Sequence, residues 1–180
     1  MPVVEVNRAP VMTLWATVVA QRLGFDRDEA LTLGKTVAGL NAQAKGRSLG
    51  IFKPGEKKGE LARRRPSGEQ FFVELLGRSV PVINTPEGVR ATAKDAPVDP
   101  AGVQRYLEGK FGGALPEVRQ AMEELAASFG PDDLEQRAYR LYAEFRPAIP
   151  AGKRGWGAKG QLDTDGIRAL AGTGLAAGGL

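Results

Sequence analysis

Apolar residues recur at helical intervals near the start of this 180-residue chain. Between Asn7 and Leu23 they stand three or four positions apart, which predicts an amphipathic helix. Pro10 falls in the first turn, where a missing amide hydrogen costs nothing, and Gly24 is placed to end the helix. The sequence therefore predicts a helix in this segment. Trp15, on its apolar face, is predicted to lie in the core.

A second helix is expected directly after the first. Asp26 and Glu29 form an Asp-x-x-Glu capping pair, and apolar residues follow as far as Leu40. Gly34 and Gly39 each cost about 1 kcal/mol relative to alanine inside a helix. Either the helix breaks at these glycines, or another helix packs closely against them.

The same stretch has the spacing of a helix-turn-helix. Ala30 would allow a close helix crossing, Gly34 would form the turn, and Leu40 would anchor a second helix that enters a major groove. Against this, Lys35 stands at a turn position that is usually apolar, and the spacing also occurs in ordinary helices. The residues that would face DNA on this hypothesis are Lys35, Thr36, Asn41, Gln43 and Lys45.

A basic segment follows, and its Gly, Lys, Arg and Pro residues predict a loop. Residues 45–66 hold eight Lys or Arg side chains against Glu56 and Glu60, a net charge of +6 in a chain whose net charge is +4. The rest of the chain is therefore slightly acidic. A polyanion would meet this segment first, although a solvated loop is the alternative. Besides Lys45, the predicted phosphate-binding residues are Arg47, Lys53, Lys57, Lys58, Arg63, Arg64 and Arg65.

Residues 70–84 predict a small β-hairpin that turns near Gly77, because β-branched and aromatic residues are frequent in them. A short helix capped by Ser67 is the alternative for residues 70–76. Pro81 cannot donate to a strand ladder, which predicts that its strand lies at an edge. A winged-helix arrangement would place Arg78 at the tip of this hairpin, but the basic loop is long for such a domain.

The second half of the chain is predicted to be helical. Asp99 starts one helix, Pro116 opens a longer one, and Asp132 with Glu135 caps another that ends before Pro147. The last two helices are expected to form an antiparallel pair. We therefore divide the chain into an amino-terminal region, residues 1–93, with the basic loop and the β element, and a carboxy-terminal helical region, residues 94–180.

A glycine-rich basic stretch precedes a last short helix at residues 163–171. Trp156 within it could stack on a nucleic-acid base while the neighbouring cations hold phosphate. The alternative is that Trp156 packs onto the core. The cations of this second patch are Lys153, Arg154 and Lys159.

Composition argues against several classes of enzyme. The chain has no histidine and no cysteine, which excludes Ser–His and Cys–His nucleophile pairs and cysteine-ligated metals. Acidic groups at 132–135 and at 163–165 could bind Mg²⁺, but both fall where helix starts are predicted, so we interpret them as caps. No export signal or membrane span is apparent, so a cytoplasmic, non-enzymatic protein without cofactor is expected.

The sequence thus predicts an α+β, mainly helical fold, with about five or six helices and one small β-hairpin. The predicted function is the binding of nucleic acid, DNA in preference to RNA, through the basic loop and the helix that precedes it. The alternative is a protein-interaction or scaffolding module whose carboxy-terminal helices pair with a partner or with a second copy. The apolar residues that would carry this alternative are Val118, Met122, Leu125, Leu141 and Phe145.

Overall fold

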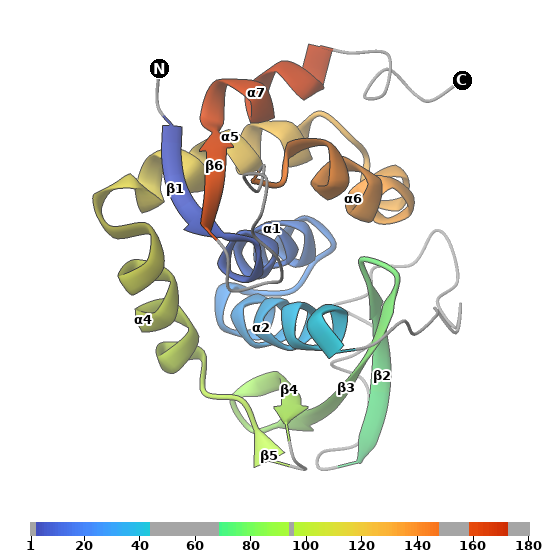
Figure 1. Cartoon of the computed structure of the whole chain (residues 1–180). Helices are drawn as coiled ribbons and strands as arrows, with labels where there is room; N and C mark the ends of the chain where they lie inside the picture. The colour runs from blue at the N-terminus through green and yellow to red at the C-terminus, as the bar shows by residue number, and fades with distance from the viewer. Residues whose placement is uncertain (1–2, 44–68, 94–95, 148–158, 173–180) are drawn as a thin grey trace.

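The computed structural model describes residues 3–43, 69–93, 96–147 and 159–172 (Figure 1). These residues form a mixed α+β fold. None of the described helices has the length and apolar character that a membrane span needs. The elements, in chain order, are β1 (Val3–Asn7), α1 (Arg8–Arg22), α2 (Arg27–Gln43), β2 (Gln70–Leu75), β3 (Arg78–Thr85), β4 (Gly88–Ala93), β5 (Ala96–Pro97), α4 (Pro100–Phe111), η1 (Gly112–Ala114), α5 (Leu115–Ala127), α6 (Pro131–Phe145), β6 (Lys159–Asp163), α7 (Thr164–Ala169) and η2 (Leu170–Gly172).

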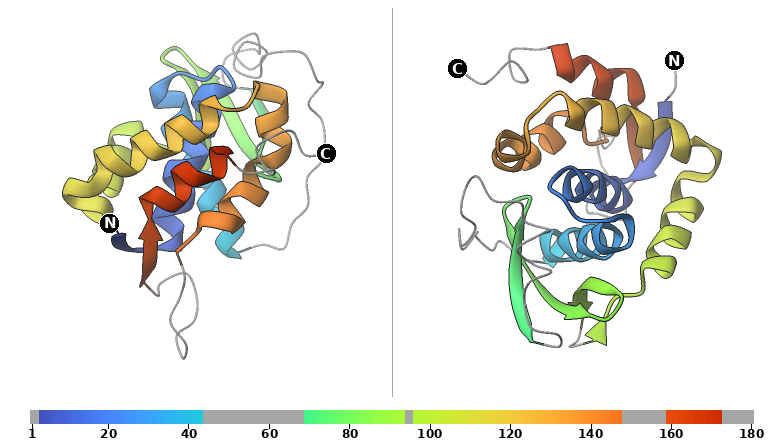
Figure 2. Two further views of the ribbon diagram at one scale, coloured as in Figure 1. Left: turned by 90° about the horizontal axis from the view of Figure 1, so that it is seen from above. Right: turned by 180° about the vertical axis from the view of Figure 1, so that it is seen from behind.

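Helix α1 lies at the centre of the fold. Every residue from Pro10 to Ala20 is buried, so the helix has no polar outer face and the prediction of an amphipathic helix is wrong. Helix α2 lies against one side of α1, while α5 and α6 lie on the other side and α4 covers a flank (Figure 1, Figure 2). The buried hydroxyls of Thr13 and Thr17 donate to the carbonyl oxygens four residues earlier, at 2.9 and 2.7 Å.

The close contact between α1 and α2 depends on Gly34. A Cβ atom at Gly34 would stand less than 3.0 Å from the carbonyl oxygen of Thr13 and from the hydroxyl of Thr17. Only glycine therefore lets the two backbones approach this far. Of the two alternatives left open by the sequence, close packing is confirmed at Gly34, and helix α2 continues through it without a break.

The predicted capping pair is present at the start of α2. Glu29 Oε1 accepts a hydrogen bond from the Asp26 amide at 2.9 Å, and Asp26 Oδ1 accepts one from the Glu29 amide at 2.8 Å. The second oxygen of Glu29 has a further role, because Oε2 accepts from the Val89 amide of β4 at 3.0 Å. This carboxylate is completely buried, and it joins the start of α2 to the sheet.

A second side chain of α2 binds the same strand. The hydroxyl of Thr32 accepts a hydrogen bond from the Ala91 amide at 3.0 Å and donates one to the carbonyl oxygen of Glu29 at 2.9 Å. Val89 and Ala91 are two residues apart, so their amides point to the same side of β4. Two side chains of α2 thus accept the hydrogen bonds of these two β4 amides. In a wider sheet, the backbone carbonyl groups of a neighbouring strand would accept them instead.

Strands β2, β3, β4 and β5 form one antiparallel sheet in that order. The predicted hairpin is confirmed, since β2 and β3 are joined at Leu76 and Gly77, which both have positive φ. Strand β4 is a third strand of this sheet, and a short β5 follows it. The expectation of one small hairpin was therefore too narrow.

The prediction that Pro81 marks an edge strand is wrong. Strand β3 lies between β2 and β4, and Pro81 is opposite Phe72 of β2. The carbonyl oxygen of Pro81 accepts from the Thr92 hydroxyl of β4 at 3.3 Å, so the backbone of Pro81 faces β4. The register between β3 and β4 reaches only as far as Val82, and the missing amide of Pro81 is therefore not needed by that ladder.

A second sheet, which sequence reasoning missed, joins the two ends of the chain. Strand β1 pairs antiparallel with β6, with Val3 opposite Asp163 and Asn7 opposite Lys159. Helix α7 follows β6 as the predicted short helix, and Asp163 caps it by accepting from the Asp165 amide at 3.0 Å. Residues from both halves of the sequence belong to one hydrophobic cluster.

The carboxy-terminal helices form at the predicted places but pack differently. Asp99 caps α4 by accepting from the Ala101 amide at 3.1 Å, as the sequence predicted. Helices α5 and α6 each pack on α1 and make little contact with each other, so the expected antiparallel pair is not formed. Trp15 of α1 is in the core as predicted: its indole nitrogen donates to the carbonyl oxygen of Ala138 at 2.9 Å, and its ring meets Phe145 edge-on at 5.3 Å.

The Glu29 carboxylate is expected to be essential for stability. Glu29→Ala would leave the Asp26 and Val89 amides without their acceptor, and we expect a loss of about 3 kcal/mol of unfolding free energy. Urea denaturation followed by circular dichroism measures this loss. The control is Glu144→Ala, at an exposed position of α6, which should change the unfolding free energy by less than about 0.5 kcal/mol. Equal effects of the two substitutions would contradict the role of Glu29.

The two glycines of α2 should respond oppositely to alanine. Gly34→Ala forces the helices apart and should cost about 2 kcal/mol, because its Cβ would meet backbone and side-chain atoms of α1. Gly39→Ala meets no atom within 4 Å and should stabilise the protein by up to about 1 kcal/mol through helix propensity. Thermal denaturation of the two single variants tests the pair. A Gly34→Ala protein as stable as the parent would argue against close packing as the reason for this glycine.

Candidate functional site

The structure describes two of the predicted DNA-facing side chains, those of Thr36 and, next to it on α2, Lys35. Its ammonium nitrogen lies 4.8 Å from the centre of the Tyr106 ring on α4, and that of Lys110 lies 5.9 Å from the same ring. Burial raises the pKa of the Tyr106 hydroxyl, and a hydrogen bond with the Thr13 side chain opposes the rise. Lys35 is thus part of a contact between a cation and an aromatic ring that links α2 to α4.

The helix-turn-helix hypothesis is wrong at the turn that it requires. Gly34 lies within the continuous helix α2, so no second helix projects from it. Asn41 and Gln43 lie near the end of the same helix. The turn signal failed because a glycine that permits close helix packing has the same local sequence as one that forms a turn.

The remaining predicted nucleic-acid contacts lie outside the described residues. They are Lys45, Arg47, Lys53, Lys57, Lys58, Arg63, Arg64 and Arg65. The patch around Trp156, with Lys153 and Arg154, also lies outside them. Arg78 follows the hairpin turn directly, at the start of β3, and the hairpin belongs to the sheet that contacts α2 through β3 and β4.

The residues proposed for the protein-interaction alternative are used by the protein's own core. Four of the five side chains have 0% exposure, and Phe145 has 7%. They cover α1 and are not available to a partner in this fold. The four fully buried side chains are Val118, Met122, Leu125 and Leu141.

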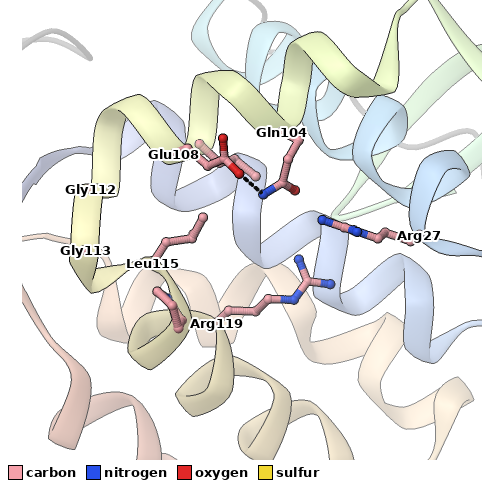
Figure 3. A pocket seen from close by; sticks show the side chains of 9 residues that line it. Arg27, Gln104, Glu108, Gly112, Gly113, Leu115 and Arg119 are labelled. Carbon is pink, nitrogen blue, oxygen red and sulfur yellow. Dashed lines mark hydrogen bonds between the residues drawn. The ribbon is translucent and has the colours of Figure 1, made fainter.

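A cleft of about 520 Å³, not foreseen from the sequence, opens where α4 turns through η1 into α5 (Figure 3). Arg27 reaches it from the start of α2 and Arg119 from α5, and the two guanidinium groups point into the same space. Gln104 and Glu108 of α4 stand across from them, joined by a hydrogen bond of 3.1 Å from Gln104 Nε2 to Glu108 Oε2. Three separate elements therefore place charged and polar groups around one opening.

The inner part of the cleft is apolar. Leu107 of α4 is fully buried, and Leu115 at the start of α5 is 9% exposed. Pro116 adds to the same wall, while Gly112 and Gly113 leave open space where side chains would otherwise stand. The cleft thus combines an apolar floor with arginines at one side. No local sequence signal marked it, because Arg27 and Arg119 are 92 positions apart.

The acidic groups considered as metal sites do not come together. Among the described residues, no group of three or more Asp or Glu side chains could hold a metal ion. At α6 the predicted start was two residues late: Gly130 is the N-cap, Pro131 opens the helix, and Asp132 and Asp133 fall in the first turn. There they favour the helix through its dipole.

Comparison with known proteins gave no match to a family model. Neither a curated protein nor a solved structure matches the chain. The function is therefore inferred from the residues and the geometry described above.

If the carboxy-terminal apolar residues serve the core, truncating one of them should destabilise the protein. Leu125→Ala should lower the unfolding free energy by about 3 kcal/mol, because it opens a cavity at a fully buried position. Tyr139→Ala, on the neighbouring α6, should cost only about 1 kcal/mol, because Tyr139 is 43% exposed. Urea denaturation of both variants measures the difference. A stable Leu125→Ala protein would restore the interaction hypothesis for that surface.

Proposed function

We propose that this protein binds nucleic acid, DNA in preference to RNA, through the basic segment at residues 45–66. The observation that carries the proposal is the concentration of charge: this segment has a net charge of +6, and the rest of the chain has −2. Lysine and arginine neutralise phosphates irrespective of base sequence, and the release of counterions drives such binding. The run Arg63, Arg64 and Arg65 is the densest part of the segment.

The elements that precede and follow the segment are both fixed in the fold. The segment follows α2, which is fixed to α1 at Gly34 and to β4 through Glu29. It precedes β2, which pairs with β3 along its whole length. A polyanion bound by the segment would therefore be attached to a rigid body.

We infer that the binding is largely independent of base sequence. Direct readout requires a helix or ribbon that presents several side chains to base edges in a groove. Lys35 points to Tyr106, and the predicted recognition helix is not formed. Contacts to phosphate then account for the affinity, and single strands and duplexes are both bound.

The proposal is tested by measuring the affinity for labelled DNA by fluorescence anisotropy over a range of salt concentrations. Arg63, Arg64 and Arg65, all changed to Gln, should weaken binding and reduce the slope of log K against log salt by about three. The matched control changes three exposed arginines outside the segment, Arg105, Arg140 and Arg146, to Gln and should leave the slope nearly unchanged. Absence of binding at low salt, or equal losses in the two variants, would refute the proposal.

A further inference from the structure

The cleft between α4 and α5 brings together two arginines that differ in how firmly they are held. Arg119 is fixed from two directions: its Nε donates to Glu123 Oε2 at 3.0 Å, and its Nη2 donates to Gln21 of α1. Its Nη1 makes no hydrogen bond with the described residues, and the side chain is 21% exposed. One edge of a pre-oriented guanidinium group therefore remains available on the cleft side.

Arg27 supplies the second positive charge. It is exposed at the start of α2 and forms no ion pair or hydrogen bond within the described part of the chain. Its side chain extends into the cleft toward Arg119 (Figure 3). Two like charges that approach one opening repel each other, and an anion placed between them relieves this repulsion. Guanidinium groups suit this task because their N–H groups match the geometry of an oxyanion.

The opposite wall limits the charge that a ligand can carry. Glu108 of α4 lines the cleft, and its carboxylate is joined to Gln104 rather than to an arginine. A second negative group on the ligand would face this carboxylate, which disfavours dianions. The apolar floor of Leu107 and Leu115 provides a surface for the uncharged part of the ligand.

We propose that this cleft binds a small carboxylic acid with an apolar body, its single carboxylate held between Arg27 and Arg119. The body of the ligand covers Leu107 and Leu115, next to the space left open by Gly112 and Gly113. A phosphate monoester carries nearly two charges at neutral pH and is disfavoured by Glu108. This site does not depend on the basic segment, and it goes beyond the binding of nucleic acid.

Benzoate is the probe, because it has one carboxylate and a flat apolar body. Binding is followed in the full-length protein by two-dimensional ¹H–¹⁵N NMR, with the backbone amides of Gly112 and Gly113 as reporters inside the cleft. A dissociation constant on the order of millimolar is expected for so small a ligand. Benzamide, the neutral analogue, should not shift these amides at the same concentration, and phenyl phosphate should bind more weakly than benzoate.

Three variants locate the site. Arg27→Gln should weaken benzoate binding about tenfold, and it should fold normally because Arg27 has no partner to lose among the described residues. Arg105→Gln, an exposed arginine of α4 that does not line the cleft, is the matched control and should bind like the parent. Glu108→Gln should strengthen binding about threefold, since it removes the opposing charge.

Each of several results would overturn the proposal. These are equal shifts with benzamide and benzoate, tighter binding of phenyl phosphate, or the same affinity for Arg27→Gln and the parent. The variant with Arg63, Arg64 and Arg65 changed to Gln should lose affinity for DNA and still bind benzoate as the parent does. The two proposals can therefore fail separately.

Discussion

Burial of α1 on all sides is the constraint on which the rest of the structure depends. A helix without a polar face must be covered completely, and here α2, α4, α5 and α6 provide the cover. Close coverage on the α2 side is possible because Gly34 has no side chain and because Thr13 and Thr17 satisfy their hydroxyls within α1. Trp15 of the same helix also donates its indole hydrogen bond to the carbonyl oxygen of Ala138 on α6. Because α4 and α5 both pack around α1, the chain turns sharply between them at η1, and the cleft lies at this turn.

Polar side chains of α2 transmit this arrangement to the sheet. Glu29 closes the helix start with one oxygen and holds the Val89 amide with the other, while Thr32 holds the Ala91 amide. These bonds bring β4 to the helix and give the sheet a fixed position. A buried carboxylate that accepts two amides is costly to remove, because its partners would be left without acceptors. The sheet and the start of α2 are thus coupled through one side chain.

The proposed functions draw on two kinds of information. Charge density in residues 45–66 is a property of composition and can be recognised without any structure. Convergence of Arg27 and Arg119 exists only in the fold, since it needs α2, α4 and α5 to meet around one opening. The helix-turn-helix hypothesis was wrong because local spacing does not distinguish a turn from a close helix contact. The spacing is present, but Gly34 allows α2 to pack closely on α1 and does not form a turn.

The sequence by itself determined the local events. It located the helix starts at Asp26 and Asp99, the hairpin turn at Gly77 and the helical character of both halves, because caps, turns and periodicity depend on neighbouring residues. Only the tertiary structure decided that β1 pairs with β6, that β3 is an interior strand and that α5 and α6 separate around α1. These choices join residues far apart in the chain, and they depend on which surfaces can be buried together, a quantity that no local pattern contains.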